Sequence, residues 1–243
     1  IKLVRNDEYW GELPDAETVE FRVIANAATR TTALINGEVD FISNIPVMDV
    51  DRLKDASNVQ VITNPSLSCN YMGFDQLNEH GSAGTDDPNP LLNVKVRQAI
   101  YHAIDIQTII DSVMNGYATV ANSYMPSICV GYNADAERPA YDPELAKQLL
   151  AEAGYPDGFY LRIDARNDSD VNADQVSQAI ASYLEKVGIQ VEVNLLPRAS
   201  FYEKTSAENL QSSFFMAGWG DSSGEGMVIF NDMLYTYDGK PGM

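Results

Sequence analysis

The residues best suited to chemistry in this 243-residue chain follow an apolar stretch near its C-terminal end. Residues 214–225 read F-F-M-A-G-W-G-D-S-S-G-E, so an apolar segment leads into a glycine-rich turn. Within it, G-D-S-S-G at 220–224 fits the G-x-S-x-G pattern in which hydrolases hold a nucleophilic serine on a sharp turn. The pattern therefore raises the hypothesis of a serine hydrolase with Ser222 as its nucleophile.

A serine nucleophile needs a neighbouring base, and the chain offers only His80 and His102. His102 lies in a predicted helix beside apolar positions, and His80 lies in a loop with no other catalytic residue type close to it. A trypsin-like enzyme would also be all-β, whereas this sequence predicts many helices. We therefore predict that the protein is not an enzyme and keep the serine hydrolase as the alternative function.

Metal and nucleotide chemistry find little support in the sequence. Asp168, Asp170, Asn172 and Asp174 alternate like the start of a calcium loop, but alanines replace the glycine and the glutamate that complete such a loop. A solvated loop with a helix cap fits these residues better. Phosphate-binding and dinucleotide-binding glycine motifs are absent from the sequence. We expect no metal and no cofactor.

Cys69 and Cys129 are the only cysteines of the chain. They show no short spacing typical of a zinc site. In an oxidising compartment they could form a disulfide, and two separate buried thiols are the other interpretation. The sequence leaves both open.

The composition restricts the classes of partner. The chain has 35 acidic and 16 basic residues, a formal net charge of −19, which repels the phosphates of nucleic acids. We expect no nucleic-acid partner. No apolar run approaches the roughly 20 residues that a membrane-spanning helix needs.

Apolar periodicity and capping residues predict several helices. Ala99, Ile100, Ala103 and Ile104 recur on one helical face after Asn93, a suitable N-cap. Asp105 is a suitable cap for a second helix that ends at Gly116. Further helices are predicted up to residue 36, from Asp142 to Gly154 with proline at the first position, and over 171–187.

Strands are predicted between these helices from alternating or short apolar runs. They cover residues 18–24, 39–42, 59–63, 68–74, 160–164, 189–195 and 214–217. Alternation of strands with helices predicts an α/β fold, a mixed β-sheet flanked by helices.

Four segments, in order, resemble a known family. Residues 6–11 read N-D-E-Y-W-G, residues 33–45 A-L-I-N-G-E-V-D-F-I-S-N-I, residues 96–105 V-R-Q-A-I-Y-H-A-I-D, and residues 141–158 Y-D-P-E-L-A-K-Q-L-L-A-E-A-G-Y-P-D-G. They are similar to the signature blocks of the family-5 extracellular solute-binding proteins of ABC importers, the oligopeptide, dipeptide and nickel-binding type.

The resemblance implies one lobe of a two-lobed periplasmic-binding-protein-like (type II) fold. Residues 1–30 would end the first-lobe sheet or hinge, and residues 31–243 would form a second-lobe α/β domain. Because family members are longer, we expect a fragment of a longer chain. The implied protein is a monomer, periplasmic or an extracellular membrane-anchored lipoprotein, which captures a peptide or small molecule and delivers it to ABC permease transmembrane subunits.

The resemblance also implies where the ligand binds. The segment after the apolar strand would lie at the mouth of the ligand cleft, where Trp219 would pack on the ligand and Asp221 would pair with an ammonium group. Relatives place this acid one position later, at the site of Ser222. Trp219 as a core anchor and Asp221 as a helix cap near Gly226 stay open. The full set implied as ligand-binding is Trp219, Asp221, Ser222, Ser223, Glu225, Tyr71, Tyr124 and Arg198.

Overall fold

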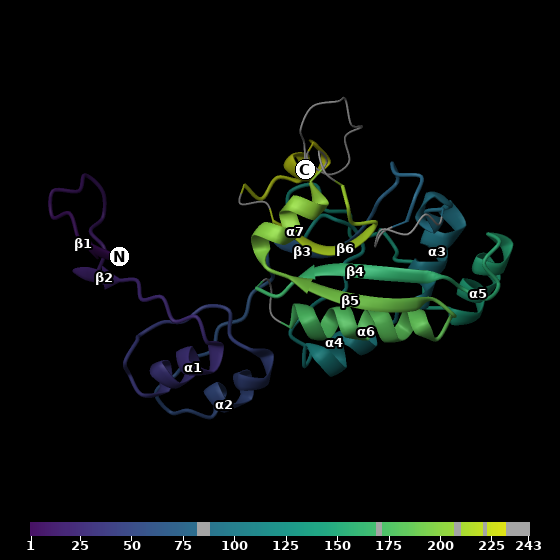
Figure 1. Ribbon diagram of the computed structural model, residues 1–243. Coiled ribbons are helices and arrows are strands. Elements are labelled where there is room, and N and C mark those ends of the chain that lie inside the picture. The colour runs from purple at the N-terminus through teal and green to yellow at the C-terminus, as the bar shows by residue number, and fades with distance from the viewer. Residues whose placement is uncertain (82–87, 169–171, 207–209, 221–222, 232–243) are drawn as a thin grey trace. The chain divides into compact units, whose positions relative to one another are not determined.

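The structure is a computed structural model, and it describes residues 1–81, 88–168, 172–206, 210–220 and 223–231. Contacts divide the chain into two compact units, Ile1–Val61 and Ile62–Met243 (Figure 1). Each unit is treated by itself below. The predicted lobe boundary after residue 30 concerns the complete protein and stays a prediction.

The first unit contains little regular structure. Strand β1 (Lys2–Val4) pairs antiparallel with β2 (Thr18–Glu20), and helix α1 (Ala27–Ile35), a 3₁₀ turn (Val47–Asp49) and helix α2 (Val50–Lys54) follow. Asn26 caps α1 by accepting a hydrogen bond from the Thr29 backbone N–H at 2.9 Å.

Of the strands predicted up to residue 63, one is shorter than predicted and two are wrong. The strand predicted over 18–24 ends at Glu20, and Phe21 and Val23 are 58% and 97% exposed. Residues 39–42 and 59–63 are irregular. The physical reason is the same in each case: an apolar or alternating segment becomes a strand only where a neighbouring strand completes its hydrogen bonds, and β1 offers three residues.

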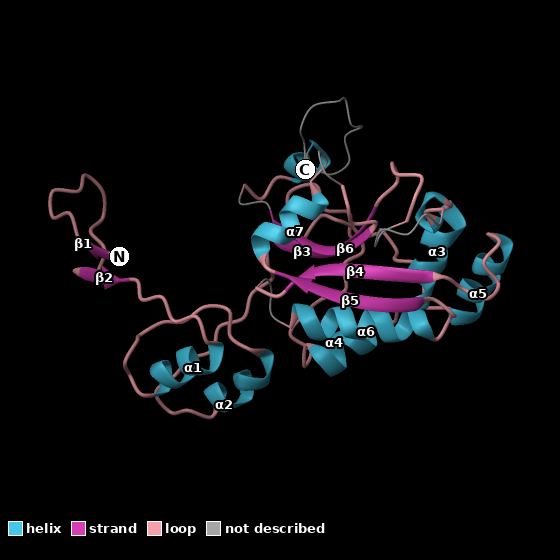
Figure 2. Ribbon diagram, viewed as in Figure 1, coloured by secondary structure: helices cyan, strands magenta, loops and turns pink. Residues whose placement is uncertain are grey.

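The second unit is built on a four-stranded sheet in the order β3-β6-β4-β5 (Figure 2). Strand β3 (Ser68–Phe74) is antiparallel to β6 (Phe214–Gly220), whereas β4 (Tyr160–Arg166) is parallel to both β5 (Gln190–Leu196) and β6. The helices are α3 (Val94–Ala103), α4 (Ile106–Val113), α5 (Pro143–Glu152), α6 (Ala173–Glu185), α7 (Arg198–Thr205) and α8 (Gly226–Ile229), with a 3₁₀ turn at Pro90–Leu92. The predicted mixed sheet flanked by helices is confirmed.

The two faces of this sheet differ in character. On one face, residues such as Ile163, Phe214 and Met216 pack in a large apolar core with α3, α4 and α6. Helix α7 covers part of the other face, where the fully buried ring of Phe201 lies 6.2 Å from the ring of Phe215 (Figure 1). Because alternate strand residues point to opposite faces, the second face receives the aromatic and charged residues of β3, β4 and β6.

The predicted caps position the core helices. Asn93, Asp105 and Asp142 each accept a hydrogen bond from a backbone N–H in the first turn of α3, α4 and α5. Gly154 follows α5 with a φ of +94°, the left-handed conformation that glycine adopts without a Cβ penalty. These helix boundaries are therefore confirmed.

Helix α7 was not predicted. The sequence analysis predicted no helix after residue 195, whereas Arg198 is the first residue of this helix. Only Phe201 of α7 is buried, so the apolar periodicity that reveals a helix is missing. In the part of the chain that is described, no helix has the length and apolarity to cross a membrane.

Candidate functional site

The candidate site lies at one edge of the second unit's sheet. Strands β4, β5 and β6 are parallel, so their carboxyl ends meet at the same edge, and β3 begins there with Ser68 opposite Gly220. Arg198 follows β5, and Trp219 lies at the end of β6. In open α/β sheets, this edge is the usual place for a ligand.

Tyr71 and Tyr124 form an aromatic pair next to this edge, with Tyr71 in the middle of β3. Tyr71 lies on β3 opposite Ala217, and its ring contacts that of Tyr124 edge-on, with centroids 5.4 Å apart. Tyr124 is 36% exposed, so this aromatic surface is open to solvent. Burial, with smaller effects of Tyr124 and Tyr202, raises the pKa of Tyr71 to about 12. Its hydroxyl is therefore neutral and able to donate a hydrogen bond.

Two arginines flank a third tyrosine beside this pair. The guanidinium carbon of Arg198 lies 5.3 Å from the ring centroid of Tyr202, and that of Arg166 lies 5.7 Å from it. Arg166 is paired with Asp168, Nε to Oδ1 at 3.0 Å. Among the described residues no carboxylate pairs with Arg198, which leaves its guanidinium available to an anionic group.

Arg166 and Tyr202 are additions that the sequence analysis missed. Arg166 is the last residue of β4, at the ligand edge. This position could have identified it as a candidate site residue. Tyr202 lies one helical turn after Arg198, but this spacing carries meaning only once α7 is known.

Trp219 is partly buried against neighbouring side chains. It pairs with Cys69 across β3 and β6, on the same face as Tyr71, and it packs in part against a small cluster of Met125, Cys129 and Ile229. Its indole N–H is buried and has no hydrogen-bond acceptor among the described residues. Packing therefore fixes the orientation of the ring, and its role toward a ligand stays a prediction.

The turn after β6 is tied to a neighbouring loop. The Val130 backbone N–H donates to the Gly224 carbonyl at 2.9 Å, and the Gly226 N–H donates to the Val130 carbonyl at 3.2 Å. The Glu225 N–H donates to the Ser223 hydroxyl at 3.1 Å. These bonds hold Ser223 and Glu225 close to the loop that also carries Tyr124.

Asp221 and Ser222 lie outside the described residues. Helix α8 begins at Gly226, with Glu225 as the residue before it. The choice between amine recognition and helix capping for Asp221 stays a prediction.

Other chemistry proposed from the sequence gains no support. His102 points its Nδ1 at the Ala140 carbonyl oxygen, 2.8 Å away, and so contributes to packing of α3. Asp168 pairs with Arg166, and the Asn172 side chain donates to the Val113 carbonyl at 2.8 Å, as expected of a structural loop. Among the residues that the structure describes, no group of three or more His, Cys, Asp or Glu side chains is arranged to hold a metal ion.

The two cysteines are separate thiols. Cys129 is buried and Cys69 is partly buried, so the interpretation without a disulfide holds. Burial raises the pKa of the Cys69 thiol, and Arg138 opposes this effect.

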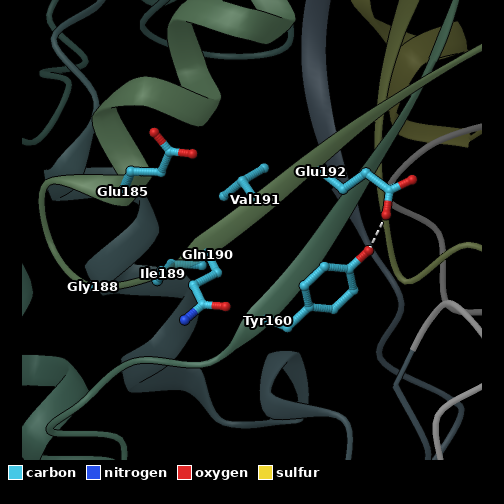
Figure 3. Close-up of a pocket in the computed structure, with 7 residues that line it drawn as sticks. All are labelled: Tyr160, Glu185, Gly188, Ile189, Gln190, Val191 and Glu192. Atoms are coloured by element: carbon cyan, nitrogen blue, oxygen red, sulfur yellow. Dashed lines mark hydrogen bonds between the residues drawn. The ribbon is translucent and has the colours of Figure 1, made fainter.

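A hollow of about 340 Å³ lies at the other end of the sheet, along the start of β5 (Figure 3). It is lined by Tyr160, Glu185, Gly188, Gln190, Glu192 and neighbours. The Tyr160 hydroxyl donates to the Glu192 carboxylate, and this bond raises the pKa of Tyr160 (Figure 3). No residue predicted for the ligand site lines this hollow.

Comparison with known proteins gives a consistent picture. The profile of the bacterial extracellular solute-binding proteins, family 5 Middle, matches residues 1–241. A heme-binding protein A from Haemophilus influenzae is 29% identical over 228 residues, 93% of this chain and 40% of the relative. A dipeptide-binding protein from Escherichia coli is 28% identical over 222 residues, 90% of this chain and 39% of the relative.

A solved structure shows the same fold. The dipeptide-binding protein from Pseudoalteromonas sp. SM9913 in complex with Met-Leu matches 92% of this chain and 43% of its own, with 26% identity and a TM-score of 0.75. The chain thus spans about 40% of the length of the curated relatives that it matches.

Proposed function

Because this chain belongs to the bacterial extracellular solute-binding proteins of family 5, we propose that its protein is the substrate-binding component of an ABC importer. It captures a solute between two lobes and delivers it to the transmembrane subunits of a permease. The second unit, with its mixed sheet, supplies one wall of the ligand cleft. We propose that the protein is located in the periplasm, or at the outer face of the membrane through a lipid anchor. We also propose that its oligomeric state is a monomer.

The proposed ligand is a peptide or a comparably small molecule. The observation that carries this proposal is the aromatic cluster of the partly buried Tyr71 with the exposed Tyr124 and Tyr202. Arg198 lies beside it, and no carboxylate among the described residues pairs with its guanidinium. Aromatic rings cover the apolar parts of a ligand, and a guanidinium pairs with a carboxylate in two parallel hydrogen bonds. Both features suit a peptide.

Ligand capture in this proposal is a conformational equilibrium. The ligand binds the closed arrangement of the lobes more tightly than the open one, so its binding shifts the population toward closure. No bond is made or broken. The serine-hydrolase alternative has no support from the relatives, which are named as binding proteins.

Calorimetric titration tests this proposal. The protein, expressed from its complete coding sequence, is titrated with dipeptides, oligopeptides, opines, sugars and heme, and the best ligand is then used with variants. We expect Tyr124→Ala to weaken binding by about 1.5–3 kcal/mol, the contribution of a large side chain that a ligand covers.

Tyr160→Ala is the matched control, because Tyr160 is a similarly exposed tyrosine on the same sheet, away from the ligand edge. Its affinity should equal that of the parent. Equal affinities for both variants would contradict the assignment of the aromatic edge as the ligand site.

A further inference from the structure

A second cavity, of about 430 Å³, lies at the amino-terminal edge of the parallel strands. Its walls come from the end of β3, the start of β6, the middle of β4 and the end of α7. None of the described residues that line the cavity is proposed for the ligand site. The residues that carry its charge are Asp75, Glu79, His80, Arg162 and Lys204.

Two cations in this cavity share one buried carboxylate. Asp164 has no exposed surface, and its Oδ1 lies 3.5 Å from Nε of Arg162 and 3.8 Å from Nζ of Lys204. The only hydrogen bond to Oδ1 comes, within the described part of the chain, from the Asn194 side-chain amide at 2.5 Å. The two basic side chains therefore carry one positive charge more than the carboxylate that they face.

Part of the hydrogen-bonding capacity of Arg162 and Asp164 is unused among the described residues. Nε of Arg162 and Oδ2 of Asp164 are both buried without a hydrogen-bond partner in the described part of the chain. Burying such groups unsatisfied costs about 1–3 kcal/mol each, more for charged ones. A folded protein meets this cost where a ligand or ordered water supplies the missing partner.

The acidic residues that line the cavity do not compete with an anion for Arg162 and Lys204. Asp75 is buried and already accepts three hydrogen bonds, from the Leu77 and Asn78 backbone N–H groups and from the Asn78 side chain, at 2.8, 3.1 and 2.7 Å. Glu79 is exposed and lies at the rim. Among the described lining residues, the cations that face the buried carboxylate are Arg162 and Lys204.

We propose that this cavity binds a small oxyanion, a carboxylate or a phosphate, whose oxygens accept hydrogen bonds from Arg162 and Lys204. Arginine and lysine side by side are the usual partners of such anions. The site is independent of the proposed solute. Helix α7 joins the two regions, since Arg198 at its start faces the solute edge and Lys204 near its end faces the anion.

The test uses the protein expressed from its complete coding sequence. Inorganic phosphate and acetate are titrated separately at an ionic strength held constant with sodium chloride, and binding is followed by calorimetry and by the thermal unfolding midpoint. We expect at least one anion to bind and to raise the midpoint. Binding of phosphate would identify the ligand group as a phosphate, and binding of acetate would identify it as a carboxylate.

Three variants distinguish a specific anion-binding site from nonspecific electrostatic attraction between the anion and the protein. Lys204→Gln should weaken binding by about tenfold, since one charge-assisted hydrogen bond is lost. Lys147→Gln, which removes an exposed lysine on α5, should bind like the parent. Asp164→Asn should strengthen binding by about tenfold, because the carboxylate that competes for both cations becomes neutral.

Three results would overturn the proposal. The first is that neither anion binds the parent or Asp164→Asn, in which case water alone fills the cavity. The second is that Lys204→Gln and Lys147→Gln bind equally well. The third is that Asp164→Asn binds more weakly than the parent. Because Lys204 is partly exposed, its substitution leaves the fold intact. Weaker binding by this variant therefore reports on the anion site and not on unfolding.

Discussion

At the scale of single residues, Tyr71 links burial to chemistry. Burial raises the pKa of its hydroxyl to about 12, above the value of 10.0 that an exposed tyrosine has. The raised pKa means that folding favours the neutral form. Its contribution to stability is complete below pH 10.0 and is lost as the pH rises through about 12.

We therefore predict a late ionisation for Tyr71. In an alkaline titration followed by tyrosinate absorbance, Tyr71→Phe should remove one ionisation with a midpoint near 12. Tyr160→Phe provides a comparison at a more exposed tyrosine. Loss of an ionisation near 10 from Tyr71→Phe would show that Tyr71 is not buried against its neighbours.

Ser222 provides a second prediction at this scale. Because His102 contacts the Ala140 carbonyl within a structural helix, the protein offers this histidine no catalytic position. A fluorophosphonate probe should leave the protein unlabelled, as judged by intact mass. Stoichiometric labelling of Ser222 that disappears in His102→Ala or His80→Ala would restore the hydrolase alternative.

The candidate site could be predicted in part. The sequence and the family resemblance selected Tyr71, Tyr124 and Arg198. In the structure the two tyrosines are in direct contact, and the Arg198 guanidinium lies over the ring of Tyr202. Tyr202 itself could not be predicted, because its place depends on the packing of α7 on Phe215. Residue types and spacing do not encode such a contact between distant segments.

At the scale of elements, the cap of α4 shows how one side chain stabilises a helix. Asp105 accepts hydrogen bonds from the backbone N–H and the hydroxyl of Thr108, at 3.0 and 2.7 Å. These bonds lower the pKa of its carboxyl below the value of 3.8 for a free side chain. Its contribution is therefore present above that value and is lost as the pH falls through the lowered pKa.

We predict that Asp105→Ala lowers the free energy of unfolding by about 0.5–2 kcal/mol at neutral pH, as is usual for the loss of an N-cap. In urea unfolding, the difference from the parent should shrink as the pH drops below 3.8. Asp157→Ala, at an exposed turn, is the control. An equal loss in both variants would remove the capping explanation.

Elements with a strong local signal could be predicted from the sequence, and the others could not. Helices α3 to α6 carry apolar stripes, α3 to α5 also carry capping side chains, and glycines follow α4 to α6. The strands β3 to β6 carry apolar or alternating runs. Helix α7 buries one side chain, and the segments 39–42 and 59–63 have strand-like composition without a neighbouring strand. At these places, contacts with distant parts of the chain determine the secondary structure, and the local sequence pattern does not reveal such contacts.

At the scale of the whole molecule, the sheet of the second unit separates the two binding surfaces that we propose. Its carboxyl-terminal edge carries aromatic rings and the Arg198 guanidinium, which has no carboxylate partner among the described residues, whereas its amino-terminal edge holds two cations near a buried carboxylate. In a protein of net charge −19, such local positive groups give anionic ligand groups a defined place to bind.

The most direct test of the account is a crystal structure of the protein expressed from its complete coding sequence, with the ligand that it retains from cell extract. We predict that the ligand contacts Tyr71 or Tyr124 and that its carboxylate, where it has one, pairs with Arg198. A ligand that contacts none of the residues at the carboxyl-terminal edge of β4, β5 and β6 would contradict the central claim.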